Sequence, residues 1–399
     1  MLNRRSFMQS SAAAALFASA GRARAETPGV TDAEIKIGQT MPYSGPASAY
    51  GVIGRTETAY FKMINEQGGV NGRKINLISL DDGYSPPKTV EQVRRLVEQE
   101  QVAFLFQTLG TPSNAAIRPY CNDNKIPQLF IATGAAMFSD PKHFPWTMGF
   151  NPNYQTEAHI YAKHILATRP DAKIAILYQN DSFGKDYLTG LKDGLSDKAS
   201  MIVKDASYET SEPTVDSQVV TLQGSGADVF LIAATPKFAA QAIRKSFDLG
   251  WNATKYVSVV SVSIASVLKP AGLDKSKGLI TAYYGKDPND PRWKDAPDMK
   301  AWQAFCAKYM SSTEFIDSNA TYGIGAAATM AQVLKQCEDD FSRDNVMRQA
   351  ANLKDFEAPL LLPGMRLNTS PTTYSPIRQM QLARFDGESW QLFGELLTG

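Results

Sequence analysis

The sequence contains few of the residues that build catalytic and metal centres. Among 399 residues there are three histidines and three cysteines. His159 and His164 lie five residues apart in a stretch expected to be helical, which is not the i, i+4 spacing of a helical metal pair. The sequence also lacks a phosphate-binding loop, a dinucleotide loop after a strand, and a nucleophile elbow. We therefore expect no metal, no cofactor and no enzymatic activity.

Excess charge and long apolar runs are also missing. The formal net charge is +1, so the composition gives no reason to expect nucleic acid as a partner. After residue 25 no window offers the roughly 18 consecutive apolar residues of a membrane span. Cys306 and Cys337 both fall in helical stretches and could pair, or all three cysteines could be buried thiols, and the odd count leaves at least one free.

The N-terminus has the pattern of an export signal. Arg4 and Arg5 form a twin-arginine motif, an Ala-rich apolar stretch of about ten residues follows, and Ala23-Arg24-Ala25 resembles a cleavage site. This apolar stretch is too short to cross a bilayer, which needs about 20 residues. We expect residues 1–25 to be a cleavable signal peptide of the twin-arginine type and the mature chain to lie in the periplasm.

The rest of the chain alternates short β-rich runs with amphipathic helical runs. The β-rich runs are apolar at both odd and even positions, as expected of parallel strands that are buried on two faces. We expect strands at 34–38, 74–80, 102–107, 127–132, 173–179, 201–207, 228–233 and 255–260, and a hairpin built from 379–385 and 389–393. Strand–helix–strand repetition predicts an α/β fold with doubly wound parallel sheets.

Turn-rich stretches divide the chain into two lobes. Proline and asparagine are dense near residues 140–152, and a second strand–helix series begins after them. We expect two similar α/β lobes, with the chain crossing between them more than once.

Ligands of open α/β sheets bind beyond the carboxyl ends of the strands, so the loops there are the candidate site. The loop after 102–107 contains Thr111, which suits a helix N-cap, followed by Pro112, which suits the first helical position. The free N–H groups of such a helix start favour an anion, although plain capping without a ligand is the common alternative. Small residues at Thr133-Gly134 and the ring of Phe183 follow two other strands.

Several motifs resemble the branched-chain amino acid class of type I periplasmic solute-binding proteins. The resemblance extends from about residue 32 to the end, and its motifs lie at 35–38, 42–46, 50–51, 64–73, 81–82 and 178–185. It implies a type I fold, with two lobes joined by a three-segment hinge. On this resemblance we expect the first lobe to comprise residues 26–150 and 283–355, and the second lobe residues 151–282 and 356–399, including the C-terminal hairpin. It also implies a receptor that presents its ligand to the permease and ATPase subunits of an ABC importer, and we expect it to act as a monomer.

The resemblance also implies which residues bind the ligand. A loop hydroxyl and helix-start amides of the first lobe hold the ligand carboxylate in this family, and an aromatic residue of the second lobe closes over it. By motif the ligand-binding residues here are Tyr50, Leu109, Gly110, Thr111, Asn114, Ala132, Thr133, Gly134, Phe183 and Val260.

One departure from the family pattern determines the expected ligand. Amino-acid binders place a carboxylate of the second lobe against the ligand ammonium, and the matching stretch here, 259–263, contains no acid. A buried ammonium without a counter-charge costs several kcal/mol. We therefore expect a small aromatic or apolar carboxylate without an α-amino group. The alternatives are a branched-chain amino acid, amide or urea binder that uses Asp181 or Glu209 as counter-charge, or a sensory ligand-binding module.

Overall fold

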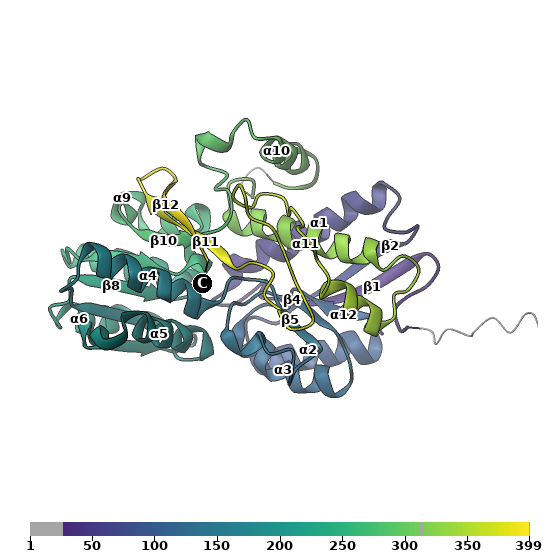
Figure 1. The fold of residues 1–399 in the computed structure, drawn as a ribbon, viewed down its shortest axis with the longest axis horizontal. Coiled ribbons are helices and arrows are strands. Elements are labelled where there is room, and N and C mark those ends of the chain that lie inside the picture. Colours follow the sequence, from purple (N-terminus) through teal and green to yellow (C-terminus); the bar gives the residue numbers. More distant parts are fainter. Residues whose placement is uncertain (1–26, 312–313, 399) are drawn as a thin grey trace, which may run out of the picture.

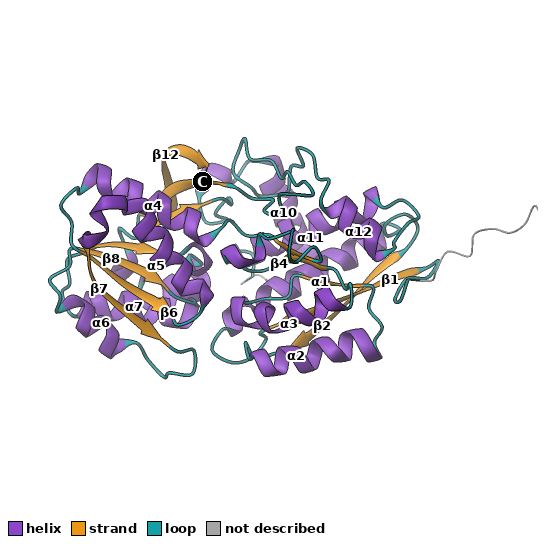
Figure 2. Ribbon diagram, turned by 60° about the horizontal axis from the view of Figure 1, so that its bottom comes forward, coloured by secondary structure: helices purple, strands orange, loops and turns teal. Residues whose placement is uncertain are grey.

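The computed structural model describes residues 27–311 and 314–398. The predicted signal peptide, residues 1–25, lies outside the described residues. The chain forms two α/β lobes, each built on its own sheet, and Figure 2 shows the two sheets side by side with helices around both. Within the described residues, no helix combines the length and the apolar character that a membrane span requires.

The first sheet is entirely parallel, with the strand order β2-β1-β3-β4-β5. Strands β3 and β4 are buried along their whole length, which explains why the sequence there is apolar at both odd and even positions. The strands are β1 (Glu34–Met41), β2 (Lys74–Asp81), β3 (Phe104–Phe106), β4 (Gln128–Ile131) and β5 (Thr147–Gly149).

The second sheet has seven strands in the order β12-β11-β10-β9-β8-β6-β7. Strands β6 to β10 pair in parallel, and β11 and β12 add an antiparallel hairpin at one edge. The strands are β6 (Ile174–Gln179), β7 (Ile202–Tyr208), β8 (Val229–Ala233), β9 (Thr254–Val257), β10 (Ile280–Tyr283), β11 (Gln379–Phe385) and β12 (Trp390–Thr398).

Helices cover both sheets. Those of the first lobe are α1 (Gly51–Glu66), α2 (Pro86–Arg94), α3 (Thr111–Asp123), α10 (Pro297–Tyr309), α11 (Ser318–Gln336) and α12 (Arg343–Ala350). Those of the second are α4 (Tyr154–Thr168), α5 (Ser182–Leu195), α6 (Asp216–Gln223), α7 (Pro236–Asp248), α8 (Lys269–Ala271) and α9 (Leu273–Ser276). Figure 1 shows α11 and α12, which come late in the sequence, beside α1 and the N-terminal strands.

The eight predicted strands and the C-terminal hairpin are confirmed, whereas β5 and β10 were not predicted. The chain crosses between the lobes after β5, after β10 and before β11. Residues between Leu353 and Ile377 pack in the core of the first lobe, so the chain re-enters the second sheet at Gln379 rather than at the expected residue 356. This segment contains little regular structure, and its sequence therefore gave no periodic signal that assigned it to either lobe.

Candidate ligand-binding site

A pocket lies between the two lobes at the carboxyl ends of their strands, and it contains about 930 Å³ of empty space, part of it open to solvent. Its lining combines aromatic rings, aliphatic side chains and a few uncharged polar groups. Among the residues that the structure describes, those that line this pocket include no Asp, Glu, Lys, Arg or His. Seven of the ten predicted site residues line it: Tyr50, Leu109, Gly110, Thr111, Ala132, Phe183 and Val260.

Helix α3 begins at the pocket wall without a side-chain cap. Gly110 occupies the N-cap position and Thr111 is the first helical residue, so the prediction that Thr111 caps the helix was wrong by one position. Gly110 has φ +102°, and an added Cβ would lie 2.6 Å from the ring of Tyr84. Only glycine fits both conditions, and a glycine cap leaves the first N–H groups of the helix without a side-chain partner.

Three predicted residues do not line the pocket. Asn114 is buried, and its side chain makes four hydrogen bonds within the first lobe. Its amide nitrogen donates to the carbonyls of Thr108 and Gly110, and its Oδ1 accepts from Thr108 and Gln128. A Cβ on Gly134 would lie 2.1 Å from the carbonyl oxygen of Pro152, so this glycine serves close packing.

Thr133 is the third of these residues. It does not line the pocket but contacts Thr111, which does. Its hydroxyl lies 2.6 Å from that of Thr111 and also accepts from the amide of Ala135. Thr133 thus orients the Thr111 hydroxyl at the start of α3.

The second lobe contributes a cluster of rings. Phe183 contacts Tyr154 edge-on at 5.0 Å between centroids, and Tyr154 stacks on Tyr187 at 5.3 Å. Glu157 lies beneath them, where it accepts hydrogen bonds from Tyr161, Tyr187 and the amide of Val259. Burial raises the pKa of this carboxyl to about 7, although those three donors oppose the shift.

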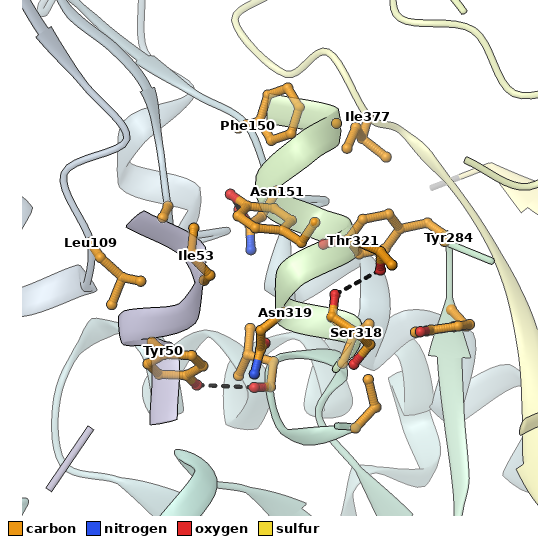
Figure 3. A pocket seen from close by; sticks show the side chains of 18 of the residues that line it. Tyr50, Ile53, Leu109, Phe150, Asn151, Tyr284, Ser318, Asn319, Thr321 and Ile377 are labelled. Atoms are coloured by element: carbon orange, nitrogen blue, oxygen red, sulfur yellow. Dashed lines mark hydrogen bonds between the residues drawn. The ribbon is translucent and has the colours of Figure 1, made fainter. Parts of the chain in front are cut away.

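The crossovers between the lobes supply a part of the lining that the sequence analysis missed. Phe150 and Asn151 follow β5, Tyr284 and Gly285 follow β10, and Ile377 precedes β11. Tyr322 of α11 donates to Oδ1 of Asn151 at 2.7 Å and packs edge-on against Phe150. Figure 3 shows this end of the pocket, with Phe150 and Ile377 beyond Asn151 and Tyr284.

Hydrogen bonds join the two lobes around the pocket. The Tyr50 hydroxyl donates to the carbonyl of Val260 at 3.0 Å (Figure 3), and the amide of Ala136 donates to Asp186 at 2.7 Å. On another side the Ser263 hydroxyl donates to Asp317 at 2.8 Å. Each pair takes one partner from each lobe, so these bonds depend on the lobes being in contact.

The acids considered as counter-charges are engaged elsewhere. Asp181 caps α5 by accepting from the amides of Phe183 and Gly184, and its other oxygen accepts from Gln179. Glu209 accepts from Asn180 in an exposed loop. Neither residue lines the pocket.

Two other groups of candidate residues, the Asp81-Asp82 pair and the three cysteines, lie outside the pocket lining. Asp81 and Asp82 accept hydrogen bonds from the backbone and hydroxyl groups of their own turn and its neighbours, as expected of turn residues. Cys121, Cys306 and Cys337 are buried and unpaired. Within the described ranges, no group of His, Cys, Asp or Glu has an arrangement that could hold a metal ion.

Comparisons with known proteins agree with this architecture. The Leu/Ile/Val-binding protein homolog 7 of Brucella suis is 24% identical over 264 residues, which are 64% of this chain and 65% of that protein. The chain thus spans slightly less than two thirds of this relative.

Two solved structures share the fold. A branched-chain amino acid ABC transporter protein of Thermus thermophilus with bound valine superimposes with a TM-score of 0.84 at 15% identity, over 93% of this chain and 98% of that one. A solute-binding protein of Rhodopseudomonas palustris, in complex with 3,4-dihydroxy benzoic acid, gives a TM-score of 0.76 at 17% identity, over 92% and 98% of the two chains. The family model for periplasmic binding proteins matches residues 34–389, so this chain belongs to the periplasmic binding protein family, and its two lobes have the type I fold.

Proposed function

We propose that this protein is the extracytoplasmic solute receptor of an ABC importer and that it binds a small aromatic or apolar carboxylate without an α-amino group. Family membership implies a periplasmic location and a solute-binding role. In this proposal the protein acts as a monomer, binds its ligand between the lobes, and then docks on the permease and ATPase subunits of the importer.

The observation that carries the ligand class is the uncharged lining of the pocket. An ammonium enclosed by these walls would lose its hydration without gaining a negative partner, and such a loss costs several kcal/mol. Glu157, which lies beneath the ring cluster, is occupied by three donors. A ligand that carries no positive charge avoids this cost.

The start of α3 in the first lobe is the part of the pocket that favours the ligand carboxylate. Helix α3 has no side-chain cap, Pro112 has no N–H, and the N–H of Gly110 donates to Ala132, so Thr111 brings its N–H and its hydroxyl to the pocket lining at the start of the helix. A helix of 13 residues has a positive dipole end there, which stabilises a carboxylate by hydrogen bonds as well as by charge.

Aromatic and aliphatic side chains surround the remaining space. Tyr50, Tyr84, Tyr154 and Phe183 provide ring faces and edges, and Leu109 and Val260 provide aliphatic contacts. The structural likeness to the Rhodopseudomonas palustris protein supports the proposal, because that protein holds a benzoic acid in the same fold. The relative named for Leu/Ile/Val binding supports a branched-chain amino acid instead, so the test includes both classes.

Isothermal titration calorimetry of the purified protein, after unfolding and refolding to remove any co-purified solute, tests the proposal. We expect one or more benzoates, cinnamates or phenylpropanoates to bind with micromolar or lower Kd, and leucine, isoleucine and valine to give no heat. Tight binding of leucine without a response to any of the acids would refute the proposed ligand class and leave the receptor role intact.

A further inference from the structure

Within the part of the chain that the structure describes, two polar groups at the end of the pocket near the crossovers have no hydrogen-bond partner. Asn151 uses its Oδ1 to accept from Tyr322, and within residues 27–311 and 314–398 its Nδ2 makes no hydrogen bond. The hydroxyl of Tyr284 also makes none within the same part of the chain. Figure 3 shows Nδ2 of Asn151 facing the pocket, and Tyr284 entering it from the opposite wall.

A fixed network holds Asn151 in this position. The amide nitrogen of Gln107 donates to the carbonyl of Phe130, so Oε1 of Gln107 faces the Tyr322 hydroxyl at 3.1 Å. Tyr322 therefore has one proton for two acceptors, Gln107 and Asn151. If the Asn151 amide were rotated by 180°, it would donate to Tyr322 and turn its oxygen to the pocket. In both orientations one hydrogen-bonding atom of Asn151 faces the ligand space.

The walls around these two groups are mostly apolar, and the polar Thr321 beside them already donates its hydroxyl to the carbonyl of Ser318 (Figure 3). Phe150 and Ile377 lie beyond them (Figure 3), and Leu360 and Leu361 complete this end of the pocket. A ligand that filled this space with hydrocarbon alone would remove water from both polar groups and leave them unsatisfied, at a cost of about 1–3 kcal/mol for each group. The ligand must therefore supply a polar atom at this end.

We propose that the ligand carries a hydroxyl group at the end remote from its carboxylate, and that this hydroxyl lies between Asn151 and Tyr284. A hydroxyl both donates and accepts, so it can pair with the Tyr284 hydroxyl and with either orientation of the Asn151 amide. A carbonyl or ether oxygen could only accept, so it could pair with both groups only while Asn151 presents its Nδ2, and a methyl group could pair with neither; a hydroxyl pairs in both orientations. Together with the ring-lined walls this specifies a hydroxyaryl carboxylate, an inference that rests on the proposed function.

The test compares acids that differ only in this hydroxyl. Calorimetry measures Kd for benzoate against 4-hydroxybenzoate and for cinnamate against 4-hydroxycinnamate, on the full mature protein. For the pair that binds, we expect the hydroxylated acid to bind at least about tenfold more tightly, since a site built to hydrogen-bond a hydroxyl rejects the analogue that lacks it.

Two variants test whether the preference for the hydroxylated acid arises at Tyr284. Tyr284→Phe removes only the hydroxyl and should reduce the preference to about threefold or less, because one of the two partners is lost. Tyr84→Phe is the matched control, because Tyr84 lines the same pocket but its hydroxyl accepts from Gln179 of the other lobe. It should change both Kd values by a common factor and leave the ratio unchanged.

The outcomes separate this inference from the proposed function. If wild-type protein binds both members of a pair equally, or the unhydroxylated acid more tightly, the inference is overturned and the proposed carboxylate class stands. If no acid binds, the proposed ligand class fails and the inference fails with it. The wild-type comparison decides between these outcomes even if a variant does not fold.

Discussion

At the scale of single residues, Gly110 shows how backbone conformation shapes the end of the pocket that we propose binds the ligand carboxylate. Its positive φ turns the chain from the β3 loop into α3, and the missing side chain makes room for the Tyr84 ring. Any other residue would both strain the backbone and displace one wall of the pocket.

We predict that Gly110→Ala lowers the free energy of unfolding and weakens ligand binding by about tenfold or more, because the added Cβ must displace Tyr84. Gly68→Ala is the matched control, since Gly68 has φ +104° but an added Cβ there would meet nothing within 4 Å. The control should show only the backbone cost, about 1–2 kcal/mol in urea unfolding, with unchanged affinity. Equal affinities in the two variants would show that the fit of Gly110 against Tyr84 is not needed for binding.

Val260 tests the electrostatic part of the account, since it lines the pocket and belongs to the stretch 259–263, which contains no acid. We predict that Val260→Asp weakens binding of a carboxylate ligand by about tenfold or more, because like charges would share a poorly solvated space. Val260→Asn has the same shape without the charge and should have a much smaller effect. If both variants bind the acid equally, charge at this wall does not select the ligand.

At the scale of elements, hydrogen bonds to Glu157 connect three parts of the second lobe. It lies on α4 and accepts from Tyr161 of the same helix, from Tyr187 of α5, and from the amide of Val259 in the loop after β9. Burial raises its pKa to about 7, so the folded protein holds the proton more tightly than the unfolded chain does.

This pKa predicts a pH dependence of stability. The contribution of Glu157 is fully present below the pKa of the unfolded chain and is lost as the pH rises through about 7. Between pH 5 and pH 8 the wild-type protein should lose about 2–3 kcal/mol more unfolding free energy than Glu157→Gln, whose amide does not titrate. Urea unfolding of both proteins at the two pH values measures this difference, and other titrating groups cancel in it. Identical losses in the two proteins would contradict a raised pKa at Glu157.

The sequence predicted the regular elements better than the site. Parallel strands buried on both faces have a clear apolar pattern, whereas the site residues came from the family resemblance, and seven of those ten line the pocket. Asn114 and Gly134 were misassigned because a small or polar residue in a loop has the same sequence signal whether it serves the ligand or the loop. Asn151 and Tyr284 were missed because they lie in crossovers whose position depends on how the two lobes pack.

At the scale of the whole molecule, the pocket exists because two separately folded lobes meet. The bonds from Tyr50 to Val260, from Ala136 to Asp186, and from Ser263 to Asp317 all cross between them. A ligand enclosed by both lobes would favour this arrangement over one in which the lobes are apart, since it contacts both only here.

We predict that Tyr50→Phe weakens binding of every ligand by about 3- to 10-fold, the equivalent of one lost hydrogen bond. Tyr43→Phe is the control, because the Tyr43 hydroxyl bonds Ser79 of its own lobe at 2.6 Å. Calorimetry gives the affinities, and small-angle scattering with saturating ligand shows whether the compact form is retained. Unchanged affinity in Tyr50→Phe would mean that this bond does not contribute to holding the lobes around the ligand.

The central claim is that the pocket accepts a carboxylate but rejects an ammonium, and a pair of ligands that differ only in the amino group tests it most directly. Calorimetric titration of the refolded protein with 3-phenylpropanoate and with L-phenylalanine gives the two values of Kd. The account predicts that 3-phenylpropanoate binds at least about a hundredfold more tightly, since an unpaired buried ammonium costs several kcal/mol. Equal or tighter binding of L-phenylalanine would contradict the account.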